Sequence, residues 1–192
     1  MIVDALILAG GRSSRLGGTA KAQLSLSGVS LLERTIQAVG GAGVRRTVIV
    51  GDAGMDAVLA IREEPAFAGP VAAIAAGLRA LPSDSDAVLV LACDMPDIER
   101  ALPQLLSGVS GDGAIAVDRG RRQQLAIVVR SPALASAVAG LPTVVDASMR
   151  ELLAGLDLAE VAVPDGSTDD IDTWDDAARF GAVAPQTTGS PR

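Results

Sequence analysis

The chain has 192 residues, a formal net charge of −7 and 49% hydrophobic residues, a globular composition whose acidic balance argues against a protein that coats nucleic acid. It has no histidine, which excludes histidine general-base catalysis and histidine-rich zinc sites, and it has no apolar run long enough to span a membrane. The lack of signal-peptide features at its start and a single cysteine, Cys93, predict a cytoplasmic protein that binds neither nucleic acid nor membranes.

Strand-like and helix-like segments alternate along the chain. We expect strands at residues 2–8, 47–50, 58–61, 87–92, 114–117, 125–129 and 158–163. We expect helices at residues 31–39, 71–81, 98–106, 132–139, 149–156 and 174–180. Such alternation predicts an α/β fold in three layers, α/β/α, with a mainly parallel sheet between the helices. We expect one domain over residues 1–183 and a disordered tail over 184–192, which is rich in proline, threonine, glycine and serine.

The starts of several predicted helices carry capping signals. Ser30 and Ser148 each begin a Ser-x-x-Glu capping box, in which the serine and the glutamate satisfy backbone N–H groups at the helix start. Thr173 and Ser131 stand where N-caps are expected. Pro103 lies inside one predicted helix, and it disfavours a continuous helix there.

The segment 8–21 reads LAGGRSSRLGGTAK and follows the first predicted strand directly. Its four glycines let the backbone approach a ligand closely, and it also holds three cations, Arg12, Arg15 and Lys21. Backbone N–H donors together with fixed positive charge suit a triphosphate. The spacing fits neither the Walker A pattern nor G-x-G-x-x-G. The alternative is an ordinary flexible connection, but loops this long in compact domains are usually functional.

Asp94 follows the most apolar predicted strand, in the sequence LACDMP. Ligands on mainly parallel sheets bind beyond the carboxyl ends of the strands, and Mg²⁺ is a hard ion that prefers oxygen ligands. We therefore expect Asp94 to hold Mg²⁺, with an N-cap of the following helix as the alternative role. The neighbouring Cys93 is expected to be a small buried residue, because no histidine is present to activate its thiol.

Three charged segments have more than one interpretation. Asp170 and Asp172 are not needed to cap the last helix, so one of them is a candidate second metal ligand. Glu63 and Glu64 precede the alanine-rich helix, and either contact a base or ribose or are solvated loop charges. The basic cluster RGRR at 119–122 is interpreted as an exposed turn between two strands. The alternative is that this cluster grips an anionic second substrate.

Together, these motifs resemble those of the molybdenum cofactor guanylyltransferases, within the wider nucleotidyltransferase group of the glycosyltransferase-A-like fold. The resemblance is carried by LAGGxxxRLG at 8–17 with Lys21, by GPVAAI at 69–74, by CDMP at 93–96 and by DIDT at 170–173. The order and spacing of these motifs cover the chain from about residue 2 to residue 180.

The resemblance implies a nucleotidyltransferase with a Rossmann-like fold. The implied reaction is the Mg²⁺-dependent transfer of GMP from GTP to the phosphate of molybdopterin, which yields molybdopterin guanine dinucleotide and pyrophosphate. GTP and molybdopterin are then the substrates, and molybdenum-insertion proteins or molybdoenzymes are candidate protein partners.

The resemblance also assigns roles to single residues. It implies that Asp94 and Asp172 are metal ligands, that Lys21 binds the nucleotide phosphates, and that Glu64 matches an acidic position that contacts the nucleotide. We call the segment 8–21 the glycine-rich loop. With its matching residues included, the expected nucleotide-binding residues are Leu8, Ala9, Gly10, Gly11, Arg12, Lys21, Glu64 and Asp94.

We expect Arg15, Lys21 and Asp94 to carry catalysis. The acceptor phosphate is largely ionised at neutral pH, so the reaction needs no general base and the lack of histidine is no obstacle. In-line positioning of the reactants and neutralisation of charge on the α-phosphate and the leaving pyrophosphate would then accelerate the reaction.

Two positions depart from the pattern of the resembled family. Relatives commonly have aspartate immediately before the lysine, where this chain has Ala20, and some have asparagine after the second strand, where it has Gly51. Both departures bear on the choice of base. The alternative enzymes are therefore a cytidylyltransferase or another nucleotidyltransferase that acts on a small-molecule phosphate. A non-catalytic nucleotide-binding module that regulates a molybdoenzyme is the alternative from a different class.

Overall fold

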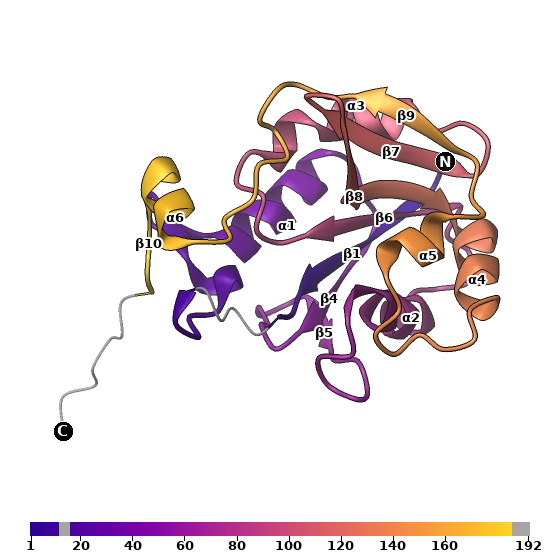
Figure 1. The fold of residues 1–192 in the computed structure, drawn as a ribbon, viewed down its shortest axis with the longest axis horizontal. Coiled ribbons are helices and arrows are strands. Elements are labelled where there is room, and N and C mark those ends of the chain that lie inside the picture. The colour runs from indigo at the N-terminus through magenta and orange to yellow at the C-terminus, as the bar shows by residue number, and fades with distance from the viewer. Residues whose placement is uncertain (12–15, 186–192) are drawn as a thin grey trace.

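The computed structural model describes residues 1–11 and 16–185, and a seven-stranded sheet runs through the molecule (Figure 1). In chain order its strands are β1 (Val3–Ala9), β4 (Thr47–Gly51), β5 (Leu59–Ile61), β6 (Ala87–Ala92), β7 (Gly113–Asp118), β8 (Arg121–Arg130) and β9 (Leu158–Ala162). Their spatial order is β5-β4-β1-β6-β8-β7-β9. Only β8 runs antiparallel to its neighbours in this sheet, so the predicted mainly parallel sheet is confirmed.

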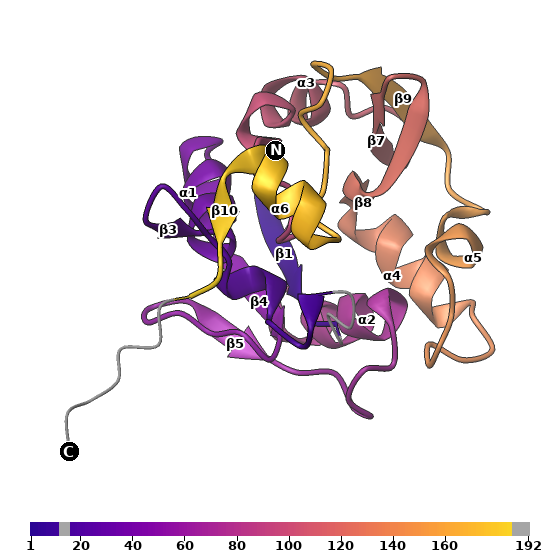
Figure 2. The ribbon, with the colours of Figure 1, turned by 60° about the vertical axis from the view of Figure 1, so that its left-hand side comes forward.

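Helices cover both faces of this sheet (Figures 1 and 2). The helices α1 (Leu31–Gly41) and α3 (Leu102–Ser107) pack on one face. The helices α2 (Pro70–Ala80), α4 (Ser131–Ala139) and α5 (Met149–Leu153) pack on the other. The structure thus has the three layers that the alternation of strands and helices predicts.

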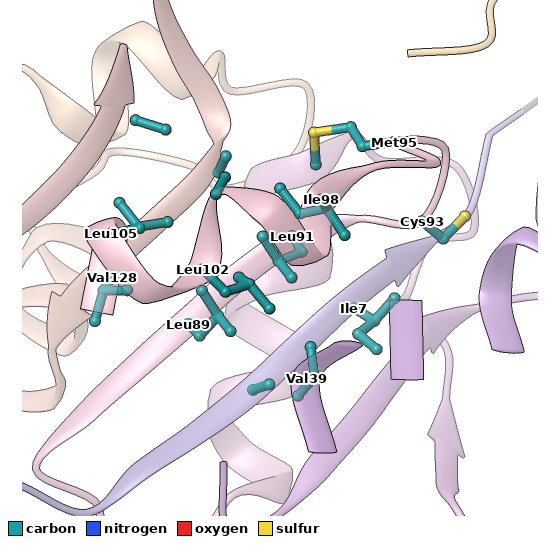
Figure 3. Close-up of a cluster of buried hydrophobic side chains, with 14 of the residues drawn as sticks. Ile7, Val39, Leu89, Leu91, Cys93, Met95, Ile98, Leu102, Leu105 and Val128 are labelled. Carbon is teal, nitrogen blue, oxygen red and sulfur yellow. The ribbon is translucent and has the colours of Figure 1, made fainter. Parts of the chain in front are cut away.

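The central strands are apolar on both faces because both faces are covered. In β1, Ile7 belongs to the core beneath α1 and α3, whereas the next residue, Leu8, belongs to the core beneath α2, α4 and α5. This is the alternation that a pleated strand imposes on its side chains. Figure 3 shows the first of these cores, where Leu89 and Leu91 of β6 meet Leu102 of α3.

A small three-stranded sheet lies outside the main one. It has the order β10-β2-β3 and consists of β2 (Ser25–Leu26), β3 (Val29–Ser30) and β10 (Ala182–Val183). With α6 (Trp174–Phe180) it encloses a third, separate core. The buried members of that core are Leu16, Leu24, Leu31, Ile171, Ala177 and Ala182. Leu16, Leu24 and Leu31 are thereby packed against the C-terminal part of the chain.

The predicted helix over 98–106 is divided in two. A 3₁₀ helix, η3 (Ile98–Arg100), precedes α3, and Pro103 lies in the first turn of α3. A proline is tolerated there because the first N–H groups of a helix have no partner within the helix. The segment is therefore helical in two short pieces, and the expectation that Pro103 disfavours one continuous helix agrees with this break.

The capping predictions are confirmed at three of four helix starts. Ser30, Ser148 and Thr173 each form a capping box with the third residue of the helix. Ser131 is not a cap, because α4 begins at this residue and its N-cap, Arg130, makes no side-chain capping bond. Among the described residues, no helix is both long enough and apolar enough to cross a bilayer. From residue 186 onward, the predicted tail lies outside the described residues.

Candidate active site at the ends of β1 and β6

The carboxyl ends of β1 and β6 lie side by side, and a cavity of about 900 Å³ opens beyond them. Leu8 pairs with Ala92, the last residue of β6, and the N–H of Cys93 donates to the carbonyl of Leu8 at 3.1 Å. The predicted nucleotide-binding residues Leu8, Ala9, Gly10, Gly11, Lys21 and Asp94 all line this first cavity. Its volume lies in the range of small-molecule sites.

Lys21 belongs to a short 3₁₀ helix, η2 (Lys21–Gln23), and points to two carboxylates. Its Nζ donates to Oδ2 of Asp94 at 2.7 Å and also to Oδ1 of Asp172. Partial burial opposes the charged form of Lys21, but the two carboxylates outweigh burial and raise the pKa of Lys21. The predicted phosphate ligand and the two predicted metal ligands are therefore one connected group.

Asp170 joins this group through the extended segment that precedes α6. Asp94, Asp170 and Asp172 each offer a carboxylate oxygen, and these oxygens lie within 4.8 Å of one another. The buried Ile171 stands between Asp170 and Asp172, and its N–H donates to the carbonyl of Asp94 at 3.0 Å. Partial desolvation, followed by the charges of Asp94 and Asp172, raises the pKa of Asp170.

The cluster fits a divalent cation. Among the described residues, three carboxylates face one ammonium group, that of Lys21, so negative charge is in excess there. Lys21 already shows that the carboxylates of Asp94 and Asp172 converge on a positive charge. An all-oxygen donor set suits a hard ion such as Mg²⁺.

The alternative roles of Asp94 and Cys93 can be judged from the same geometry. The side chain of Asp94 is paired with Lys21, and the N-cap of η3 is Asp97, so Asp94 does not cap the following helix. Cys93 is buried as predicted, and burial followed by the charge of Asp94 raises the pKa of its thiol. A thiol of this kind is a poor nucleophile.

Of the two adjacent glutamates, Glu63 lines the first cavity and Glu64 does not. Glu63 is only 6% exposed, and its Oε1 accepts a hydrogen bond from the N–H of Phe67 at 2.9 Å. Its Oε2 is buried and has no hydrogen-bond partner among the described residues. Sequence pattern alone cannot choose between two adjacent glutamates, because only the path of the loop decides which one turns inward.

Gly51, where some members of the resembled family have asparagine, ends β4 beside the glycine-rich loop. Its φ is +143°, and a Cβ at this position would lie 2.5 Å from backbone atoms of Ala9 and Gly10. A side chain here would displace the start of the glycine-rich loop. Ala20, the other departure, is exposed at the edge of the first cavity.

A second cavity of about 850 Å³ meets the first one at the carboxylate cluster. Lys21, Asp94 and Asp172 line both cavities. From the basic cluster, Arg122 lines the second cavity, whereas Arg119 pairs with Asp169 at 2.9 Å. The basic cluster is thus divided between the turn after β7 and the first residues of β8. This strand begins at Arg121, earlier than predicted. The predicted catalytic Arg15 and the predicted nucleotide ligand Arg12 lie outside the described residues.

Comparisons with known proteins identify the family of the chain. Residues 5–161 match the model of the family described as MobA-like NTP transferase domain. The chain is 33% identical over 177 residues to a molybdenum cofactor guanylyltransferase of Pseudomonas putida, which covers 81% of this chain and 86% of that protein.

Solved structures share the fold at lower identity. Molybdopterin-guanine dinucleotide biosynthesis protein A from Archaeoglobus fulgidus superposes with a TM-score of 0.68 at 21% identity, covering 92% of this chain and 96% of the other. The 2-C-methyl-D-erythritol 4-phosphate cytidylyltransferase from Thermus thermophilus also superposes with a TM-score of 0.68, at 20% identity, covering 94% and 97%. These similarities show that the fold is shared with both proteins.

Proposed function

Because the chain belongs to the family of MobA-like NTP transferase domains and is therefore a nucleotidyltransferase, we propose that it transfers GMP from GTP to the phosphate of molybdopterin. The products are molybdopterin guanine dinucleotide and pyrophosphate. The observation that carries this proposal is the meeting of two cavities at Lys21, Asp94 and Asp172. One cavity then takes the nucleotide and the other takes the acceptor, with the charged cluster where the two substrates react.

The proposed reaction is an in-line displacement at the α-phosphorus of GTP. An oxygen of the acceptor phosphate forms the new P–O bond, and the bond between the α-phosphorus and the bridging oxygen of pyrophosphate breaks. Lys21 and the backbone N–H groups of the glycine-rich loop would hold the triphosphate, and Arg15 is the further predicted cation. Asp94, Asp170 and Asp172 would hold Mg²⁺, which when bound neutralises charge on the phosphates.

Glu63 supports guanine as the base. Guanine presents two donors side by side, its ring N1–H and its 2-amino group, and a carboxylate can accept from both. Cytosine has only one amino group on this edge and places a ring acceptor beside it. The Oε2 of Glu63, which is buried at the first cavity and has no hydrogen-bond partner within residues 1–11 and 16–185, therefore favours GTP over CTP.

The alternative is a cytidylyltransferase, since a solved structure with this fold carries that name. The discriminating experiment incubates the purified protein with Mg²⁺, molybdopterin, and either GTP or CTP, and measures pyrophosphate release together with the dinucleotide product. We expect release with GTP only when molybdopterin is present. Faster release with CTP would reassign the base, and nucleotide binding without release would favour a regulatory module.

The role of Glu63 gives a first prediction. Glu63→Gln should reduce the ratio of kcat/KM for GTP over CTP by roughly tenfold, since a hydrogen bond to a charged group contributes about 1.5–3 kcal/mol. The matched control is Glu64→Gln, the same change one residue further along, which should leave the ratio unchanged. An unchanged ratio in Glu63→Gln, or an equal fall in both variants, would contradict the assignment.

A further inference from the structure

Asp118 makes a set of contacts that the proposed chemistry does not use. It is the last residue of β7 and only 3% exposed. Its Oδ1 accepts a hydrogen bond from the N–H of Gly166 at 3.1 Å. Its Oδ2 accepts from the N–H of Thr168 at 3.2 Å and from the Thr168 hydroxyl at 2.8 Å. Although burial alone would raise it, these hydrogen bonds keep the pKa of Asp118 below its ordinary value.

Both hydrogen-bond partners of Asp118, Gly166 and Thr168, belong to residues 163–172, which connect β9 to α6 and which we call the strap. The other contact of Asp118 is an ion pair with Arg119 at 3.6 Å. The strap carries Asp170 and Asp172, two of the three carboxylates of the cluster. Its start is held by the N–H of Val163, which donates to the carbonyl of Val117 at 3.1 Å. Its end is held by Ile171 against Asp94. In the middle of the strap, Asp118 holds Thr168. This residue lies two positions before Asp170, the first of the two carboxylates that the strap contributes.

We propose that Asp118 is a positioning residue, which fixes the strap so that Asp170 and Asp172 lie within reach of the same cation as Asp94. The inference rests on the proposed metal site of the nucleotidyltransferase. Three donors converge on the two oxygens of Asp118, and each of the two oxygens is used. An asparagine has only one acceptor oxygen, and its amide NH₂ would face an N–H donor, so at least one of these bonds must be lost.

The test measures binding of Mn²⁺ alone, with free Mn²⁺ counted by electron paramagnetic resonance in the absence of nucleotide. Asp118→Asn should raise the Kd for Mn²⁺ about fivefold to tenfold, on the scale of one lost buried hydrogen bond. In turnover with GTP and molybdopterin, the KM for Mg²⁺ should rise similarly, while kcat at saturating Mg²⁺ stays within about twofold, because excess cation reorders the strap. A residue that only stabilises the fold would not move the metal KM apart from kcat.

Asp112 provides the matched control. It precedes β7 at the opposite end, and its Oδ2 also accepts a backbone hydrogen bond, from the N–H of Asp157 at 2.9 Å. Asp112→Asn therefore makes the same isosteric change and removes the same negative charge far from the strap, while its amide oxygen can still accept this single bond, and the Kd for Mn²⁺ should not change. Thr168→Val removes only the hydroxyl bond to Asp118, keeps the backbone bonds, and should raise this Kd about twofold to threefold.

The outcomes separate this inference from the proposed function, because Mn²⁺ binding needs neither GTP nor molybdopterin. An unchanged Kd in folded Asp118→Asn, an equal rise in Asp112→Asn, or a wild-type protein that binds no Mn²⁺ would overturn the inference. If Asp118→Asn does not fold, as reported by the fluorescence of Trp174, the only tryptophan, then Thr168→Val decides. A shifted Kd in a protein that transfers no GMP would keep the inference and reject the function.

Discussion

Lys21 has two roles that compete for its charge. Its ammonium group contacts Asp94 and Asp172, and it also lines the first cavity beside the glycine-rich loop. A bound triphosphate would draw the same charge toward its oxygens, and a divalent cation on the carboxylates would leave it free to move. Two changes at single residues test these roles separately.

The change Asp94→Asn removes the carboxylate that pairs with Lys21 and that lies beside Asp170 and Asp172. Turnover should fall by roughly 100-fold or more, as it does when an enzyme loses a main electrostatic stabiliser of its transition state. The measurement is pyrophosphate release at saturating GTP and Mg²⁺, with the melting temperature as a control for folding. A correctly folded Asp94→Asn protein with full activity would refute the metal-binding role.

The change Lys21→Ala should act in opposite directions on the two ligands. The Kd for GTP should rise about tenfold or more, because charge-assisted hydrogen bonds to phosphate contribute about 1.5–3 kcal/mol. The Kd for Mn²⁺ alone should fall, since Asp94 and Asp172 lose the positive charge that competes with the cation. Isothermal titration with each ligand measures both constants, and unchanged GTP affinity would exclude the phosphate role.

The sequence predicts the residues of the site that follow strand ends. The loop after β1 and Asp94 after β6 come together because neighbouring parallel strands end at the same edge of a sheet. Asp118 also follows a predicted strand, 114–117, but its partners lie about 50 residues further along the chain, so the sequence does not show which segment it holds. A contact between residues this far apart in the chain follows from the pairing of β7 with β9, which local sequence does not specify.

At the scale of elements, too, the sequence predicts what local patterns determine and misses what long-range contacts determine. Long apolar runs predict the central strands, and the Ser-x-x-Glu pattern predicts the starts of α1 and α5. The strands β2, β3 and β10 have two residues each, which is too short for any periodicity to show. They pair only because the C-terminal segment returns to the loop after β1, and this depends on the tertiary structure.

The capping box of α1 predicts a pH dependence of stability. The N–H of Ser30 and then its hydroxyl donate to Glu33, and these bonds lower the pKa of Glu33. The box therefore contributes its full stability above about pH 4.3, the ordinary value for glutamate, and loses it as the pH falls through the lower value of the folded state. Urea unfolding should show Glu33→Gln less stable than wild type at pH 7, with a difference that shrinks in acid. A constant difference would contradict this explanation.

In the whole molecule, the site lies where the chain changes direction across the sheet. After β1 the chain adds β4 and β5 on one side, and it then returns to add β6 on the other side of β1. The connections leave in opposite directions from this point, and a crevice opens between them. The helix α2 bounds this crevice, since Pro70 and Ala73 line the first cavity. The distance between α2 and the sheet therefore affects the width of the first cavity, the proposed nucleotide site.

Gly77 controls that distance. A Cβ at Gly77 would lie 2.6 Å and 2.8 Å from the two terminal methyl carbons of Leu6, which is fully buried in β1. Gly77→Ala gains about 1 kcal/mol of helix propensity but overpacks the core, at a cost of about 1–3 kcal/mol. We expect a net loss of stability of up to about 2 kcal/mol and weaker GTP binding, because α2 must move away from the sheet.

The control is Gly40→Ala in α1, where no other described atom lies within 4 Å of an added Cβ. There the helix gains propensity without overpacking, so the protein should become more stable by up to about 1 kcal/mol, with unchanged GTP affinity. Urea unfolding and GTP titration of the two variants measure both effects. If Gly77→Ala stabilises the protein as Gly40→Ala does, then Leu6 has room to adjust, and the spacing of α2 does not limit the site.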